Sequence, residues 1–232
     1  MKMTYIGHSG FLMETEACYC IFDYYHGALP PLRTDKPVLV FASHAHQDHY
    51  NPKVFDLLHE AGAKQITAVL SDDISAEDYP RTDGAVTVVP VSCHRTYELP
   101  CDMTVHTLRS TDEGVAFLMQ CPEGTLYHAG DLNDWLWPGE SEEYNRTMAE
   151  NYRCEMGRLK EYLKGESIDI ACVPLDPRQE EFYDRGMVGF LKEISVSEVW
   201  PMHFWEQPEV IDRFLKDYPA YTNLTRKCDA FQ

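Results

Sequence analysis

Short apolar or alternating segments follow one another through the first half of the chain, and their pattern is typical of strands. Two pairs are predicted hairpins, the first two segments across residues 14–16 and the last two across residues 122–124. The central segment of five apolar residues is predicted to be a buried strand. The predicted strands are Met3–Met13, Ala17–Tyr24, Val38–Ala42, Gln65–Leu70, Val86–Ser92, Met103–Leu108, Gly114–Cys121 and Thr125–His128.

Apolar residues recur at helical spacing mainly in the second half. In Thr147–Leu163 they return at steps of three and four, and Gly165 ends the segment. Two more short strands are predicted among these helices, so strands and helices mix in both halves of the chain. The pattern by itself predicts an α/β or an α+β fold. The other predicted helices are Lys53–Ala61, Phe182–Ile194 and Glu209–Tyr218, and the other strands are Ile168–Pro174 and Glu198–Trp200.

The composition is that of an ordinary globular protein. The 232 residues are 44% hydrophobic, which is enough for a substantial core. Since no stretch resembles a linker, we expect one domain, residues 1–232. The eight cysteines form no CxxC pair, and we expect them to be reduced, mainly as small core residues.

The charge and hydropathy of the chain restrict its partners. The formal net charge of −18 repels phosphate backbones and anionic membranes, so we expect no nucleic acid as a partner. No run of about 20 apolar residues is present that could span a membrane. The amino-terminal segment does not resemble a secretory signal, and we therefore expect a cytoplasmic location. The sequence leaves the oligomeric state open.

The six residues His44–His49 contain three histidines and one aspartate directly after the apolar strand Val38–Ala42. Residues 51–52, Asn-Pro, then break the chain before a predicted helix. Open α/β sheets place their chemistry on such loops, at the carboxyl ends of strands. Neutral imidazole and carboxylate are ligands of Zn²⁺, Mn²⁺ and Fe²⁺. The cluster therefore predicts a metal site.

This HxHxDH pattern resembles the metallo-β-lactamase superfamily of metal-dependent hydrolases. Three further segments match in the expected order. Met3–Phe11 resembles the opening strand of the branch related to ascorbate-phosphate lactonase, Tyr127–Asp131 resembles the superfamily's Gly-Asp turn, and Pro201–Phe204 resembles its last ligand turn. The resemblance implies an α+β fold, an αββα sandwich in which two mixed sheets pack face to face with helices outside.

The resemblance also implies a site for one or two divalent ions. His44 and His46 would contribute to a first position, Asp48, His49 and His203 to a second, and Asp131 would bridge the two. Asp48 and Asp131 are the implied catalytic residues. Such a centre generates a hydroxide nucleophile at neutral pH.

One histidine of the family pattern is missing from this chain. Arg-Ser-Thr-Asp-Glu-Gly, residues 109–114, stands where a ligand is expected before the strand that follows. Asp112 is the simplest substitute, since a carboxylate binds the same ions, with Glu113 second and His94 or His106 third. The alternative is a first position that is weak or empty. A carboxylate-rich position would favour Mn²⁺ or Fe²⁺ over Zn²⁺.

Other polar and aromatic residues near these turns are weaker candidates. Arg178 could hold an anionic substrate group, or it could pair with Asp176 and brace a loop. Asn133 and Trp135 begin the predicted long loop 133–145, which is either a pocket wall or a packed surface loop. The early-strand residues His8 and Asp23 either orient metal-binding imidazoles or play no part in the site.

The sequence thus predicts a metal-dependent hydrolase that attacks a small-molecule ester, lactone or similar bond with a metal-bound hydroxide. Two alternatives remain open. One is phosphodiester hydrolysis at the same site, for which the acidic composition shows no basic groove. The other is a metal-binding or ligand-sensing domain that has lost turnover along with the missing histidine.

Overall fold

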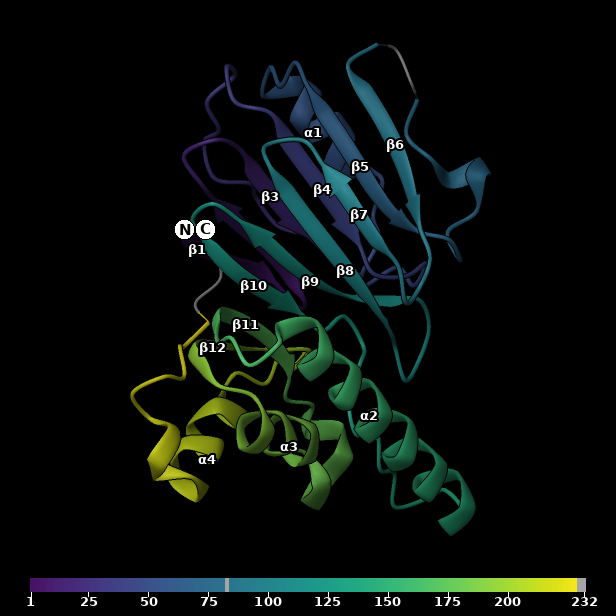
Figure 1. The fold of residues 1–232 in the computed structure, drawn as a ribbon, viewed down its shortest axis with the longest axis vertical. Helices are drawn as coiled ribbons and strands as arrows, with labels where there is room; N and C mark the ends of the chain where they lie inside the picture. Colours follow the sequence, from purple (N-terminus) through teal and green to yellow (C-terminus); the bar gives the residue numbers. More distant parts are fainter. Residues whose placement is uncertain (82–83, 229–232) are drawn as a thin grey trace.

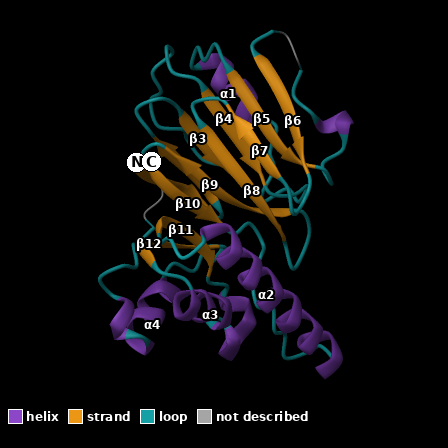
Figure 2. Cartoon of the chain, viewed as in Figure 1, coloured by secondary structure: helices purple, strands orange, loops and turns teal. Residues whose placement is uncertain are grey.

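Two six-stranded sheets pack face to face, and helices cover their outer faces (Figures 1 and 2). The computed structural model describes residues 1–81 and 84–228. The arrangement is the predicted αββα sandwich, and both sheets contain parallel and antiparallel pairs. The α+β fold class and the mixed character of the sheets are therefore confirmed.

The first sheet is built from the amino-terminal part of the chain, in the order in which its strands occur. Its first three strands are antiparallel neighbours, and the last four run parallel to one another. The strands are β1 Lys2–Gly7, β2 Gly10–Glu14, β3 Tyr19–Phe22, β4 Val38–Ala42, β5 Ile66–Ser71 and β6 Val86–Val91.

The second sheet follows the order β12, β11, β10, β9, β8, β7. Strands β10, β11 and β12 are parallel, and β7 to β10 are joined by antiparallel pairing. The strands are β7 Thr96–Leu99, β8 Met103–Arg109, β9 Val115–Cys121, β10 Gly124–His128, β11 Ile168–Pro174 and β12 Val196–Met202.

Three apolar layers hold the sandwich together. The middle layer lies between the sheets and includes Phe22 and Phe41 from the first sheet and Phe117 from the second. A second layer joins the first sheet to helix α1, and a third joins the second sheet to α2, α3 and α4. The helices are α1 Lys53–Glu60, α2 Glu142–Leu163, α3 Arg185–Glu193 and α4 Glu209–Asp217, with short 3₁₀ turns at Ala76–Asp78, Pro177–Phe182 and Pro219–Tyr221.

The predicted single strand Met3–Met13 is wrong, because the chain reverses at residues 8–9 and forms β1 and β2. Alternation continues through the turn and hides it in the sequence. Gly10 makes the tight reversal possible, since a Cβ there would lie 2.8 Å from the carbonyl oxygen of Gly7. The reversal leaves His8 at the end of β1, in the left-handed conformation with φ of 54°.

Other elements also differ from the sequence-based expectation. Helix α2 begins at Glu142, not at residue 147, because Ser141 caps it by accepting a hydrogen bond from the backbone of Tyr144. The predicted helix 182–194 divides into a 3₁₀ turn and α3, which starts at Arg185. The edge strand β7, which the polar sequence Thr-Tyr-Glu-Leu concealed, was not predicted.

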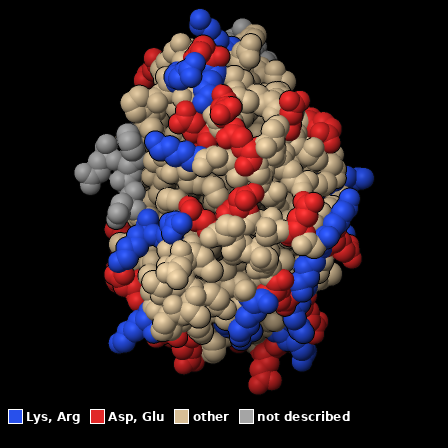
Figure 3. Space-filling view, turned by 60° about the vertical axis from the view of Figure 1, so that its left-hand side comes forward, with Lys and Arg blue, Asp and Glu red and all other residues tan. Residues whose placement is uncertain are grey.

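The surface is acidic but mixed. Asp and Glu side chains on the face drawn in Figure 3 are interspersed with Lys and Arg. Within residues 1–81 and 84–228, each helix is too short or too polar to cross a membrane.

Gly114 lies just before β9, where the second sheet approaches the loop after β4 of the first sheet. A substitution at Gly114 therefore tests how closely the two sheets pack. A Cβ at Gly114 would lie 2.0 Å from the carbonyl oxygen of Ser43, and its φ is +68°. We expect Gly114→Ala to lower the free energy of unfolding by about 2 kcal/mol or more. Gly157→Ala is the control, because that exposed position in α2 has open space around its Cβ and should gain about 0.5–1 kcal/mol. Denaturant titration of both ion-free variants measures the difference, and equal effects would contradict the packing described.

Candidate metal centre

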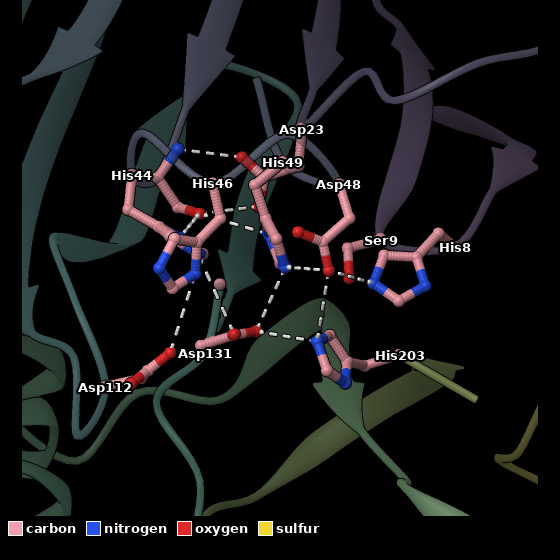
Figure 4. A network of polar contacts seen from close by, with 12 residues as sticks. His8, Ser9, Asp23, His44, His46, Asp48, His49, Asp112, Asp131 and His203 are labelled. Atoms are coloured by element: carbon pink, nitrogen blue, oxygen red, sulfur yellow. Dashed lines mark hydrogen bonds and ion pairs between the residues drawn. The ribbon is translucent and has the colours of Figure 1, made fainter. Parts of the chain in front are cut away.

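The loops that follow several strands bring seven of the predicted site residues to one end of the sandwich (Figure 4). The loop after β4 carries the histidine cluster, and backbone hydrogen bonds from residues 49 and 50 to the carbonyl of His46 fold it into a turn. Residues Asp131 and His203 directly follow, or nearly follow, β10 and β12. The described chain therefore places side chains far apart in sequence around one small volume.

The first group of potential ligands contains His44, His46, Asp112 and Asp131. One ligand atom from each lies within 4.8 Å of the others, close enough to surround one ion. The Nε2 atom of His44 is 3.0 Å from the Nδ1 atom of His46, and this Nδ1 is 3.7 Å from Asp112 Oδ2. His44 and Asp131 are buried, whereas His46 and Asp112 are exposed. The group thus opens to solvent on one side.

The second group contains His8, Asp48, His49 and His203, again with ligand atoms within 4.8 Å of one another. Asp48 Oδ2 is the common neighbour. It lies 3.1 Å from Nε2 of His8, 3.8 Å from Nε2 of His49 and 3.9 Å from Nε2 of His203. The turn at the end of β1 brings His8 to this group.

The carboxylate of Asp131 lies between the two groups (Figure 4). Its Oδ2 atom is 3.8 Å from Nε2 of His44 in the first group. Its Oδ1 atom is 3.2 Å from Nε2 of His49 and 3.3 Å from Nε2 of His203 in the second. One oxygen thus faces each group, as a bridging carboxylate requires.

Buried groups behind the imidazoles fix their orientation. Nδ1 of His49 donates to Asp23 at 2.7 Å, and Nδ1 of His203 donates to Asp176 at 3.0 Å. The hydroxyl of Ser43 donates to Asp23 and so accepts from Nδ1 of His44 at 3.0 Å. In each ring Nδ1 carries the hydrogen-bonded proton, which turns Nε2 toward the centre.

Several of the atoms that face this centre lack hydrogen bonds of regular geometry within the described residues. They are Nε2 of His8, Nε2 of His49 and Oδ1 of Asp131, and all three are buried. Buried polar atoms are normally satisfied, and leaving them without partners is costly. Divalent cations would satisfy them, so the residues present fit a metal centre.

The charges of the centre also favour a bound cation. Burial opposes ionisation of Asp131, but His203 and His49 outweigh it and hold the pKa of Asp131 well below its ordinary value. Burial also lowers the pKa of His203, yet the charge of Asp131 and hydrogen bonds to Asp131 and Asp176 raise it to about 9. Without an ion, His49 and His203 keep their protons beside ionised carboxylates, whereas burial lowers the pKa of His44 to about 4. A bound cation would replace the protons of His49 and His203.

The four candidates for the missing ligand have different neighbours in the structure. Asp112 belongs to the first group, whereas Glu113 approaches the opposite ring nitrogen of His46, Nε2, at 3.6 Å. His94 pairs with Glu155 of helix α2, and His106 stacks on Tyr162, so both have other partners. Among the candidates only Asp112 stands beside His44 and Asp131 in that cluster.

The remaining predicted residues divide between the pocket and the core. Trp135 and Arg178 line a cavity beside the centre. Asn133 is buried, and its amide donates to Gln179 behind the loop. The sequence did not establish that Asp23 and Asp176 orient the imidazoles. The available signal was their position, because each follows a strand, as the ligand candidates do.

Comparisons with known proteins agree with this picture. A family model described as "Beta-lactamase superfamily domain" matches residues 2–147. A protein of Opitutus terrae named "UPF0173 metal-dependent hydrolase" is 29% identical over 230 residues, which cover 90% of this chain and 87% of that protein.

Solved structures share the fold. A novel metallo hydrolase from the archaeon Ignicoccus hospitalis has a TM-score of 0.66 at 17% identity, covering 99% of this chain and 95% of its own. CmlA, a diiron β-hydroxylase from Streptomyces venezuelae, has a TM-score of 0.60 at 12% identity, covering 96% of this chain and 52% of its own. Since the family model matches more than half of the sequence and the sandwich recurs in these structures, the chain belongs to the metallo-β-lactamase superfamily and is a metal-dependent hydrolase.

Proposed function

We propose that the protein hydrolyses an ester or lactone bond in a small molecule with the help of two divalent metal ions. The observation that carries this proposal is the position of Asp131, whose two oxygens face two separate groups of imidazoles and carboxylates. Two ions so placed would lower the pKa of a shared water to about 7 and supply a hydroxide nucleophile at neutral pH.

The ligands of the first ion are proposed to be His44, His46, Asp112 and the bridging Asp131. Their arrangement supports the view that Asp112 replaces the missing histidine, because its carboxylate faces the same ring nitrogen of His46 as His44 does. A position with two carboxylates suits Mn²⁺ or Fe²⁺ better than an all-histidine position would, and Zn²⁺ also accepts these ligands.

The ligands of the second ion are proposed to be Asp48, His49, His203 and Asp131. His8 is added to the family pattern, since its Nε2 lies in the same group and is buried without a regular hydrogen bond. Asp23 and Asp176 hold the rings of His49 and His203 through their Nδ1 protons, which makes Nε2 a better ligand. Asp48 and Asp131 are the catalytic carboxylates of this proposal, because they would hold the ions that supply the nucleophile.

Ester or lactone chemistry is favoured by the opening strand, which resembles the branch related to ascorbate-phosphate lactonase. The name of the Opitutus relative, a metal-dependent hydrolase, supports hydrolysis in general. The cavity beside the centre has a volume of about 360 Å³, which suits a small molecule.

Metal removal tests the proposal directly. Chelation should abolish hydrolysis of a panel of aryl esters and lactones, and added Mn²⁺ or Zn²⁺ should restore it, because the nucleophile depends on the ions. Asp48→Ala should remain inactive after metal is returned. The assay should be paired with elemental analysis, in which about two ions per chain are expected in the active protein. Full turnover in a verified ion-free sample would refute the mechanism.

A pair of neighbouring substitutions tests the unusual ligand. Asp112→Asn should weaken binding at the first position by about ten-fold or more, or reduce the stoichiometry by one ion per chain, because it removes a charged ligand. Glu113→Gln is the matched control and should leave both values unchanged, since Glu113 faces the outer nitrogen of His46. Isothermal titration with Mn²⁺ measures affinity and stoichiometry together. Equal effects of the two substitutions would show that Asp112 is not a ligand.

A further inference from the structure

One wall of the cavity beside the metal centre is strongly aromatic. Trp135 and Trp137 stack in parallel with ring centroids 5.7 Å apart, and both line the cavity. Tyr144 and Trp205 also line it, with 39% and 37% of their surface exposed. They are the two exposed large hydrophobic residues in residues 1–81 and 84–228. Exposed aromatic surface gathered at one concave site is typical of ligand binding.

The other walls carry charge. Asp48, Asp112 and Asp131 lie on the side of the metal centre, and Arg178 is the one Lys or Arg among the described residues that line the cavity. The guanidinium group of Arg178 lies over the ring of Trp205 at 4.7 Å and near that of Trp137 at 5.8 Å. Indole faces attract a cation, so both rings help to fix the position of this side chain.

A buried partner also fixes the orientation of Arg178. Its Nε atom donates to both carboxylate oxygens of Asp176, at 2.9 and 3.0 Å, and its Nη2 atom donates to the same carboxylate. The side chain of Asp176 is fully buried, whereas 45% of the Arg178 side chain is exposed. The guanidinium therefore presents its opposite edge, with the N–H groups of Nη1, away from Asp176.

That outer edge retains the capacity to bind an anion. Asp176 also accepts the Nδ1 proton of His203, so its negative charge serves two donors. A guanidinium binds a planar carboxylate through two parallel hydrogen bonds, and a group held in place loses little entropy on binding. In an acidic protein, a rigid cation exposed among aromatic rings is suited to an anionic group on a flat ligand.

We propose that Arg178 binds the carboxylate of the substrate, and that the substrate is a small aromatic or similarly flat carboxylic acid bearing the ester or lactone bond. The identity of that bond rests on the proposed function. The aromatic wall of Trp135, Trp137, Tyr144 and Trp205 contacts the flat part of the molecule. Arg178 and the metal centre thus hold the two ends of one substrate.

Binding of benzoate and of its neutral analogue benzyl alcohol tests the proposal. Tryptophan fluorescence and isothermal titration are used on metal-loaded and ion-free protein, with metal content measured in every sample. We expect the loaded wild type to bind benzoate more tightly than benzyl alcohol. Arg178→Gln should raise the Kd of benzoate by about ten-fold or more and leave that of benzyl alcohol unchanged, because a charge-assisted pair is lost. The Kd of benzoate for Arg178→Lys should lie between that of the wild type and that of Arg178→Gln.

Two controls make the result specific. Arg213→Gln removes a guanidinium that lies over Tyr183 at 3.9 Å, outside the lining of the cavity, and should not change benzoate binding. Trp205→Ala should weaken binding of benzoate more than that of acetate, since acetate has no ring to stack.

Two outcomes would overturn the inference. One is an Arg178→Gln variant that binds benzoate as the wild type does. The other is a variant that loses benzoate and bound metal in parallel, which would mean that Arg178 acts through Asp176 and His203. The proposed function fails separately, if hydrolysis needs no metal while benzoate binding still requires Arg178.

Discussion

The carboxylate of Asp131 is the constraint on which the centre depends. It is buried between two groups of imidazoles and aspartates, and its two oxygens face different groups. A buried carboxylate must be matched by positive charge, and without an ion the imidazoles of His203 and His49 supply it, which holds the pKa of Asp131 well below its ordinary value. Two divalent ions would supply this charge in place of the imidazole protons and would satisfy ring nitrogens that otherwise lack hydrogen bonds of regular geometry. The charges of the centre and its buried atoms without regular hydrogen bonds therefore both favour bound divalent cations.

The sandwich makes this centre possible because β4 of the first sheet and β10 and β12 of the second all end beside it. The polar loops gather there, and the apolar layers below hold the strands in register. Close approach matters as much as burial. Gly130 places Asp131 against Ser43, since a Cβ at position 130 would lie 2.7 Å from that of Ser43. Ser43 in turn links Asp23 to His44. The backbone that turns the carboxylate inward therefore also contacts the groups that orient the rings.

Much of the fold and part of the site could be predicted from local pattern. Alternation and helical spacing predicted most strands and helices, and the HxHxDH loop predicted a metal site. The turn at residues 8–9 was missed because alternation persists through it, and with it the approach of His8 to Asp48. The pairing of Asp176 with Arg178 is local, but its hydrogen bond with His203 depends on tertiary contact between β11 and β12. Neighbours in space, and not sequence spacing, distinguish Asp112 from Glu113.

A crystal structure of the Mn²⁺-loaded protein, with anomalous scattering recorded at the manganese edge, tests the central claim most directly. The account predicts two peaks about 3.5–4 Å apart, each within bonding distance of a different oxygen of Asp131. Asp112 should contact the ion that His44 binds, and His203 should contact the other. A single peak on one side of Asp131, or two peaks that do not share this carboxylate, would contradict the bridged centre.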